Sequence, residues 1–245
     1  MQIQWVGQSK IWNAPKPDYA RYALPLVEEQ VLSVAFDSEF AHLKRLTKTC
    51  AINCTSRLAQ RVALSTTGLN PKWQPYNWSP GVIKAPASCQ NNGVYFSDLT
   101  EHVWLLSEYA PELANIGVVE EKMIGIPYEL DGAYIEGNLL FFAPIRQQWN
   151  QDFTKIVAYE RADAPPGLFE TAATAIKAVG LDNSCFCIEF RHFEEKWKVV
   201  EVHARLGEDV RLTEKLSDSN PLKAIENLCT LPAASAAIER DWIKA

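Results

Sequence analysis

The chain has 245 residues, 47% of them hydrophobic and 22% charged, which is enough to bury a core as one large domain or two lobes. Its net charge of −6 gives no general attraction to nucleic acid or to an anionic membrane, so we expect neither as a partner. The N-terminus lacks the basic start and apolar run of a signal peptide, and no segment approaches a membrane span. We therefore expect a cytoplasmic protein.

The N-terminal half predicts mainly helices. Residues 1–30 indicate only a short strand or loop segment. The elements expected after it are helices at 38–48, 55–68 and 98–110 and an apolar strand, VIKA, at 82–85. The second helix has the clearest ends, because Thr55 or Ser56 can cap its start and Gly68 can stop it.

The C-terminal half alternates strands and helices. The elements expected are a strand at 116–125, a hairpin at 129–145 that turns at 136–138, a helix at 166–180, a hairpin at 186–209 that turns at 193–196, and a helical stretch from 220 to near 245. Together these patterns predict an α+β fold with two small antiparallel sheets, each packed against helices.

The hairpin FCIEFRHFEEKWKVVEVHARLGED carries a glutamate in the middle of each apolar run. Counting back from the turn, Glu189 faces residue 200 or 201, so Glu189 and Glu201 should be cross-strand neighbours. Two like charges that close are destabilising on their own, but a divalent cation between them reverses the effect, and carboxylate oxygens suit Mg²⁺. His203 and Arg205 follow on the face of Glu201, where an arginine could bind phosphate. A surface hairpin with a salt-bridged polar face is the alternative explanation.

Basic residues elsewhere favour a phosphate site without proving one. Lys84 ends an apolar strand just before the polar loop APASCQNNG, where a cation can contact phosphate. Arg57 and Arg61 lie one turn apart on a predicted helix and could add positive charge. A solvated helix face is the more common explanation of such a pair.

The order of these segments resembles the ATP-grasp superfamily from about residue 38 to 212. TSRLAQR is similar to its "DK…R" helix, and VIKAPASCQNNGV to its "KP…G-rich…GV" strand and lid loop, with Lys84 and Gly93 in register. VVEEKMIGIPYELDG is similar to the hinge motif whose backbone holds adenine. GLDNSCFCIEFR and KVVEVHARLGED are similar to the two motifs that carry the metal-binding carboxylates.

The resemblance implies a role for each matching residue. The metal ligands would be Glu189, Glu201 and His203, the phosphate-contacting residues Arg57, Lys84 and Arg205, and the nucleotide-binding hinge residues Glu120, Glu121, Lys122, Met123 and Glu129. Of these, Lys84 and Arg205 would take part in the phosphoryl transfer. His203 stands where the family usually has asparagine. Pro127 stands where it has a ribose-binding glutamate, a task that Glu129 could take.

The resemblance also implies a division of the chain. We expect residues 1–40 to be a short remnant of the domain that usually precedes this fold, residues 41–118 to form the lobe with the lid, and residues 119–245 to form the lobe with the metal site. Because the preceding domain commonly supplies part of the substrate pocket, a homodimer or a partner protein could complete the site.

The function implied is that of an ATP-dependent carboxylate–amine ligase that acts through an acylphosphate on small-molecule substrates, with ATP and Mg²⁺ as cofactors. The glycine-poor loop and His203 leave a second interpretation open. In that alternative the chain is a catalytically degenerate nucleotide-binding module that acts with a partner protein. The sequence does not name the carboxylate or the amine, but Arg146, just after an apolar strand, is a candidate anchor for a substrate carboxylate.

Overall fold

The computed structural model describes residues 2–7, 17–76, 81–87, 100–150, 156–207, 220–233 and 243–244, the side chains of 100–102 and 243–244 excepted. In chain order the elements are β1 (Ile3–Val6), β2 (Tyr22–Pro25), α1 (Gln30–Phe36), η1 (Ser38–Phe40), α2 (Lys48–Thr55), α3 (Arg57–Ala63), β3 (Trp73–Pro75), β4 (Val82–Lys84), α4 (Thr100–Tyr109), η2 (Pro111–Leu113), β5 (Val118–Glu120), β6 (Ile126–Ile135), β7 (Asn138–Phe141), β8 (Ile145–Trp149), β9 (Ile156–Arg161), α5 (Leu168–Val179), β10 (Ser184–Phe193), β11 (Lys196–His203), α7 (Pro221–Leu228) and β12 (Ile243–Lys244).

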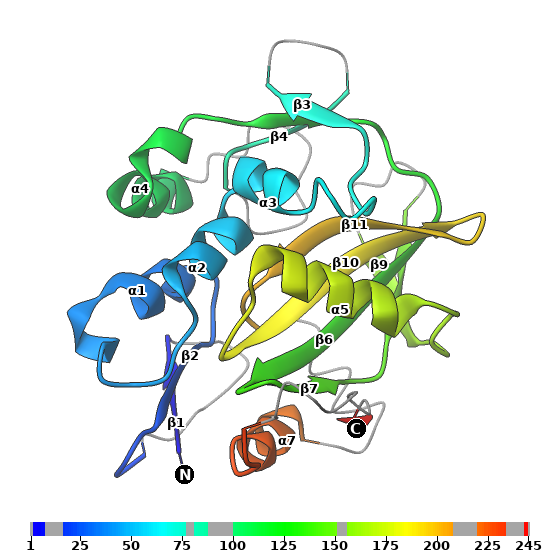
Figure 1. The fold of residues 1–245 in the computed structure, drawn as a ribbon. Helices are drawn as coiled ribbons and strands as arrows, with labels where there is room; N and C mark the ends of the chain where they lie inside the picture. Colours follow the sequence, from blue (N-terminus) through cyan, green and yellow to red (C-terminus); the bar gives the residue numbers. More distant parts are fainter. Residues whose placement is uncertain are drawn as a thin grey trace.

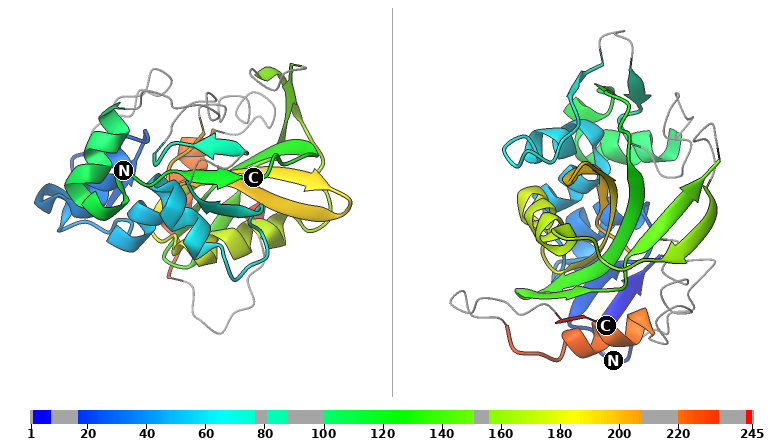
Figure 2. Two further views of the ribbon diagram at one scale, coloured as in Figure 1. Left: turned by 90° about the horizontal axis from the view of Figure 1, so that it is seen from above. Right: turned by 90° about the vertical axis from the view of Figure 1, so that its right-hand side faces the viewer.

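A seven-stranded sheet forms the centre of the molecule (Figure 1). Its main path runs β11-β10-β6-β7-β12, and β8 pairs with both β6 and β9. All pairs are antiparallel except the short parallel pairing of β12 with β7. A separate three-stranded sheet, β3-β5-β4, lies beyond the β11 edge, and β1 and β2 form a parallel pair near the N-terminus (Figures 1 and 2). The α+β class is confirmed.

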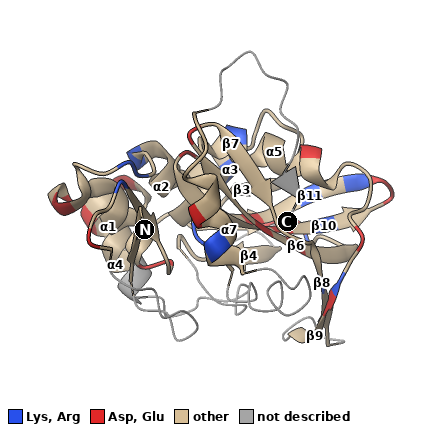
Figure 3. Cartoon of the chain, turned by 90° about the horizontal axis from the view of Figure 1, so that it is seen from below, with Lys and Arg blue, Asp and Glu red and all other residues tan. Residues whose placement is uncertain are grey.

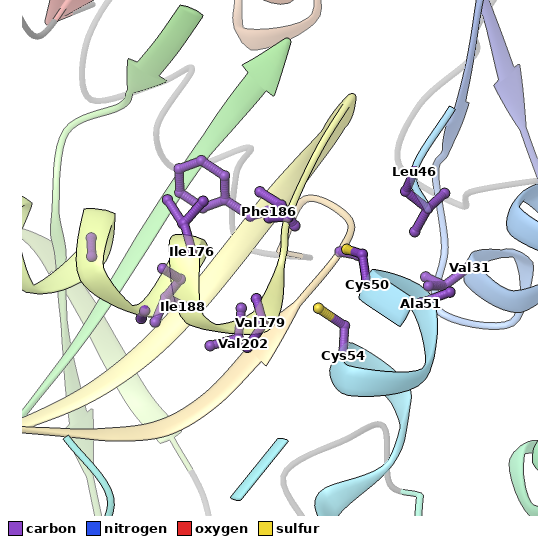
Figure 4. Packing of buried hydrophobic residues seen from close by; sticks show 14 of the residues in the cluster. Val31, Leu46, Cys50, Ala51, Cys54, Ile176, Val179, Phe186, Ile188 and Val202 are labelled. Carbon is purple, nitrogen blue, oxygen red and sulfur yellow. The ribbon is translucent and has the colours of Figure 1, made fainter. Parts of the chain in front are cut away.

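Helices α5 and α2 bury one face of the central sheet (Figure 4). Ile176 and Val179 of α5 meet apolar side chains of β10, while Cys50 and Cys54 of α2 fill the space beside them. These residues are at most 3% exposed. The helix pattern of 166–180 therefore correctly identified a core helix, which ends at Gly180 with a left-handed φ of 71°.

Two tight turns set the register of the central sheet. Glu136 and Gly137 connect β6 to β7 with φ values of 46° and 84°, and Glu194 and Glu195 connect β10 to β11 with 48° and 62°. Paired positive φ values match the right-handed twist of the strands that such two-residue turns join. Both predicted hairpins are confirmed, and the second turn fixes which residues of β10 and β11 face each other.

Three predicted helices are wrong in their extent. The helix expected at 55–68 is only α3, which ends at Ala63 with Leu64 as its C-cap, so Gly68 does not stop it. Of the helix expected at 38–48, residues 38–47 form only the 3-10 turn η1 and an irregular stretch, because Lys44 pairs with β2 through backbone hydrogen bonds to Arg21 and Ala23. Helix α2 begins at Lys48 instead, after Thr47 caps the amide of Cys50. At the other end of the chain, α7 stops at Leu228, and residues 243–244 form strand β12.

The described part of the chain contains no helix with the length and apolar character needed to cross a bilayer. Among the residues drawn in colour, basic and acidic positions are mixed over the cartoon and do not separate by sign (Figure 3). The charges that matter for a site are therefore those that the fold brings together locally.

Candidate active site

Three glutamates form a row across the central sheet. Glu201 on β11 lies opposite Glu189 on β10, and Glu189 also lies opposite Glu129 on β6. Residues directly opposite one another share a face of the sheet, and the alternating neighbours Ile188 and Val202 belong to the core under α5. The predicted pairing of Glu189 with Glu201 is confirmed, and the row points away from the helix-covered face.

A β-bulge follows this row and turns backbone oxygens toward two cations. After the Glu189–Glu201 pair the register shifts, so that Val200 is the extra residue of β11. Its carbonyl oxygen accepts hydrogen bonds from Nη2 of Arg61 at 2.6 Å and from Nζ of Lys84 at 3.3 Å. Bulges commonly re-aim groups beside functional sites, and this one brings Lys84 next to Glu201.

Glu201 is 9% exposed and is contacted by two basic side chains. Its Oε1 forms an ion pair with Nη1 of Arg57 and lies 3.2 Å from Nε2 of His203. Burial alone would raise the pKa of Glu201, but Arg57 and then His203 hold it well below its usual range. Repulsion from Glu189 was expected to be unrelieved without a metal, and this expectation is wrong because Arg57 and His203 already neutralise Glu201.

His203 is held at both ring nitrogens. Nδ1 lies 3.0 Å from Oε2 of Glu28, and Nε2 faces Glu201. Burial lowers the pKa of His203, but Glu201 and, less strongly, Glu28 raise it to about 9, against the opposing charge of Arg205. In the metal-free protein His203 is therefore an imidazolium at neutral pH, whereas a histidine that binds a metal must be neutral.

Glu189, Glu201 and His203 each offer a ligand atom, and these atoms lie within 4.8 Å of one another. Two carboxylate oxygens and one imidazole nitrogen at this separation fit a divalent cation, provided that the cation displaces the proton from His203. The structure thus brings the three predicted ligands together. Their binding of a metal stays a prediction.

Lys84 and Arg61 share a buried carboxylate. Oε2 of Glu120 lies 2.9 Å from Nζ of Lys84, and Oε1 lies 2.5 Å from Nε of Arg61. Burial lowers the pKa of Lys84 despite Glu120, and the two cations lower the pKa of Glu120 despite its burial. Because Arg57 and Arg61 are 5% and 1% exposed, the interpretation of this pair as a solvated helix face is wrong.

Helix α3 packs along the outer edge of β11, and this packing places Arg57 and Arg61 in the site. The amide group of Gln60 donates to the carbonyl of Val202 at 2.7 Å and accepts from its N–H at 3.1 Å. Arg61 adds a bond to the carbonyl of Val199 at 3.0 Å. The helix starts at Ser56, whose side chain caps the amide of Ala59, so the predicted N-cap is confirmed. These contacts replace a missing neighbouring strand and fix Arg57 beside Glu201.

Arg205 lies past the end of β11, beside His203. Its Nε donates to Oε2 of Glu28 at 3.0 Å, and its Nη1 donates to the carbonyl of Leu206 at 2.9 Å. Burial would lower the pKa of Arg205, but Glu28 and other nearby anionic groups raise it above its usual value. Arg205 is thus a permanent cation at the edge of the glutamate row.

The hinge places its glutamates differently from the sequence expectation. The Glu120 carboxylate points to Lys84 and Arg61, and Oε1 of Glu121 accepts from the backbone N–H of Lys72 at 2.8 Å. Both side chains therefore organise the protein around the hinge. A contact of the 121–123 backbone with adenine stays a prediction.

Glu129 belongs to a second buried acidic group. It is 3% exposed and accepts from Nε2 of Gln147 at 2.9 Å, while Asp131 accepts from the N–H of Gly207 at 2.6 Å. Glu129, Asp131 and Cys187 also offer atoms within 4.8 Å of one another. A Cβ at position 207 would overlap Oε1 of Glu129, so the Glu129 side chain would have to shift.

Two expectations lie outside this arrangement. Gly93 and most of the lid loop, from 88 on, fall outside the described residues, as do the residues after 207 in the last motif. Arg146, a candidate anchor for a substrate carboxylate, lies on β8 and forms a half-exposed ion pair with Glu160. The structure does not bring Arg146 to the glutamate row.

Sequence reasoning did not find Glu28. The residue lies just before α1, 175 positions from His203, and no spacing in LPLVEEQVLS distinguishes it from a surface glutamate. Gln60 was missed for the same reason. Their roles depend on the packing of the N-terminal segment and α3 against β11, and local periodicity carries no information about that packing.

Comparison with solved structures shows which fold this arrangement represents. An L-amino acid ligase from Bacillus licheniformis matches 78% of this chain with a TM-score of 0.61 and 21% identity, over 50% of its own length. A D-alanine–D-alanine ligase from Bacillus anthracis in complex with ATP matches 84% with a TM-score of 0.59 and 14% identity, over 77% of its length. A biotin carboxylase from Campylobacter jejuni matches 87% with a TM-score of 0.59 and 15% identity, over 56% of its length.

The chain has the ATP-grasp fold, and the resemblance seen in the sequence is confirmed at the level of the fold. It spans about half the length of the L-amino acid ligase and of the biotin carboxylase. No protein-family model and no curated protein matches the sequence. The site residues above therefore rest on this chain's own geometry.

Proposed function

We propose that the protein is an ATP-dependent carboxylate–amine ligase that forms an acylphosphate intermediate. The observation that carries this proposal is the ion pair between Arg57 and Glu201. The pair brings Arg57, which like Lys84 is expected to contact phosphate, against Glu201, which like Glu189 is expected to hold a metal. A purely structural hairpin would not need a buried lysine, a buried arginine and a carboxylate row at one point.

The nucleotide would lie between the β3-β5-β4 sheet and the glutamate row. Its adenine would contact the backbone of 121–123, and its phosphates would replace carboxylates as partners of Lys84 and Arg57. Both cations are already desolvated, so a charge-assisted contact with phosphate would be strong. Glu129 would contact the ribose hydroxyls, and its Oε2 already accepts a hydrogen bond from Gln147.

Glu189, Glu201 and His203 would hold Mg²⁺, which when bound supplies positive charge against the negative charge of the phosphates. The chain's own cations would act in the same direction. Lys84 and Arg57 would stabilise the charge that builds on the transferring phosphoryl group, and Arg205 would orient the γ-phosphate or the substrate carboxylate.

In the reaction, a substrate carboxylate oxygen would attack the γ-phosphorus of ATP, and the bond to ADP would break. The amine would then attack the acyl carbon, phosphate would leave, and the amine would lose a proton. None of these steps needs a protein nucleophile.

We further propose that a second copy or another protein completes the substrate pocket. We also propose that the division of the chain at about residues 40 and 118 reflects separate lobes.

One observation favours the alternative of a nucleotide-binding module without ligase activity. In the structure Arg57, Glu201 and His203 are engaged with one another, so each must change partner before it can bind phosphate or metal. Such a closed network would also suit a protein that binds nucleotide and signals that state to a partner.

Hydroxylamine trapping separates the two functions without knowledge of the amine. The protein is incubated with ATP, Mg²⁺ and hydroxylamine over a panel of amino acids and other small carboxylates, and ADP and hydroxamate are measured. A ligase gives equal amounts of both products with at least one carboxylate, because hydroxylamine captures the acylphosphate. Lys84→Ala should abolish the signal, whereas Lys223→Ala, a change at an exposed surface lysine, should leave it intact. Nucleotide binding without either product across the panel supports the module.

A further inference from the structure

Glu28 connects the N-terminal segment to the far end of the candidate site. It is 7% exposed, and its backbone carbonyl accepts the N–H of Val31 at 3.1 Å at the start of α1. A single side-chain oxygen, Oε2, lies 3.0 Å from both Nδ1 of His203 and Nε of Arg205. The two partners are 175 and 177 residues away in the sequence, so this contact exists only in the folded chain.

The contact determines which nitrogen of His203 can bind a metal. An ionised carboxylate only accepts hydrogen bonds, so Nδ1 of His203 must carry the hydrogen that points at Glu28. In the neutral ring the lone pair then lies on Nε2, the nitrogen that faces Glu201 and the metal-ligand group. Carboxylates that accept from the second nitrogen of a histidine ligand typically fix its tautomer and orientation in this way.

The same oxygen orients Arg205. With Nε held by Glu28 and Nη1 held by the carbonyl of Leu206, the guanidinium plane has a fixed direction beside His203. A cation with fixed geometry loses less freedom when it binds a phosphate or a carboxylate. Glu28 thus orients two neighbouring side chains: His203, the expected metal ligand, and Arg205, the expected anion-binding residue.

We propose that Glu28 is a positioning residue of the metal–phosphate site. It directs Nε2 of His203 to the metal and aligns Arg205 with the substrate anion, and it touches neither ligand itself. This inference rests on the proposed function, because it requires His203 to bind the metal. It also makes the N-terminal segment a part of the site.

A merely structural role is the competing explanation. Glu28 would then only neutralise two buried cations, and its removal would lower stability without a specific effect through His203. A double-mutant cycle distinguishes the two roles, since it measures whether the effect of Glu28 depends on His203.

The experiment measures the affinity of the full-length protein for Mn²⁺ in the presence of saturating ADP. Glu28→Gln should weaken Mn²⁺ binding by roughly 10- to 100-fold in the wild-type background, as is typical for loss of a carboxylate behind a histidine ligand. In the His203→Asn background the same change should have little effect. Glu29→Gln, which removes the adjacent charge, is the matched control and should leave the affinity unchanged.

Equal losses in both backgrounds would overturn the inference while leaving the proposed function intact. Failure of the wild-type protein to bind Mn²⁺ with ADP would instead overturn the proposed function, and the inference with it.

A second measurement needs no change at Glu28, in case Glu28→Gln does not fold. In the Mg²⁺–ADP complex of the wild-type protein, the nitrogen NMR signals of His203, assigned by their loss in His203→Asn, should show the neutral ring with its hydrogen on Nδ1. A hydrogen on Nε2 in that complex would overturn the inference.

Discussion

Glu201 carries two contacts on one oxygen, with Arg57 and with His203, and all three side chains are buried. Removing its charge leaves two buried cations without that partner. Breaking one side of a buried ion pair is far more costly than losing a surface pair, because the remaining charge stays desolvated.

We therefore expect Glu201→Gln to lower the free energy of unfolding of the metal-free protein by about 3–5 kcal/mol. Urea denaturation in the presence of a chelator measures this loss. Glu160→Gln, which breaks the half-exposed pair with Arg146, is the control and should cost less than about 1 kcal/mol. Equal stability of the two variants would show that the Glu201 contacts do not stabilise the fold.

The raised pKa of His203 makes part of this stability depend on pH. The groups that face His203 are Glu28, Glu201 and Arg205, and their net effect moves its pKa from 6.5 to about 9 on folding. A folded pKa above the unfolded value stabilises the native state fully below pH 6.5, and this contribution is lost as the pH rises through about 9.

The difference in unfolding free energy between wild type and His203→Asn should therefore shrink by about 3 kcal/mol between pH 6 and pH 10, since a tenfold change in proton affinity corresponds to about 1.4 kcal/mol. Urea denaturation of the metal-free proteins across this range measures it. A difference that stays constant with pH would mean that His203 does not gain its proton from these contacts.

Lys84 gives the most direct residue-level test of nucleotide binding. Its ammonium is buried and lies 2.9 Å from Glu120, so a phosphate would meet a desolvated charge. Lys84→Ala should weaken ATP binding at least tenfold, or about 1.4 kcal/mol. Calorimetric titration with ATP and Mg²⁺ checks this, with exposed Lys223→Ala as the control. Unchanged affinity in Lys84→Ala would remove Lys84 from the site.

At the scale of elements, helix α3 acts as the cover of an exposed strand edge. The two bonds between Gln60 and the backbone of Val202 satisfy groups that β11 cannot pair on its outer side. Gln60→Leu should keep the volume but orphan a donor and an acceptor, at about 1–3 kcal/mol each. Urea denaturation should show this loss, whereas the exposed Gln148→Leu should have little effect. If Gln60→Leu has the same free energy of unfolding as the wild type, water or a neighbouring group must bind the Val202 backbone in place of the Gln60 amide.

Element prediction succeeded where the signal is local. The local signals that succeeded are the turn residues of both hairpins, Ser56 at the start of α3, Gly180 at the end of α5 and Asn220 at the start of α7. The helix expected at 38–48 failed because Lys44 pairs with β2, and that contact depends on tertiary packing.

The same division holds for the candidate site. The pairing of Glu189 with Glu201 followed from counting back from a turn, and the structure has it. The burial of Arg57 and Arg61 could not be predicted, because their partners Glu201 and Glu120 lie on strands far away in the sequence. The lone Glu28 gave no local signal at all.

At the scale of the whole molecule, segments far apart in sequence meet at β11. Glu28 comes from the N-terminal segment, Arg57 from α3 and Lys84 from the three-stranded sheet, and each contacts the strand or the residues just after it. The site therefore exists only when these parts are packed together. The proposed metal–nucleotide site would depend on this convergence.

The affinity for ADP with and without Mg²⁺ tests this account most directly, in wild type and in Glu189→Gln. Glu189 is the suitable position because none of the salt bridges of the described chain depends on it, in contrast to Glu201. By calorimetry, Mg²⁺ should tighten ADP binding to the wild type by at least tenfold, or about 1.4 kcal/mol. Glu189→Gln should lose this gain and keep the affinity measured in chelator. Equal tightening by Mg²⁺ in both proteins, or none in the wild type, would contradict a metal–nucleotide site on the glutamate row.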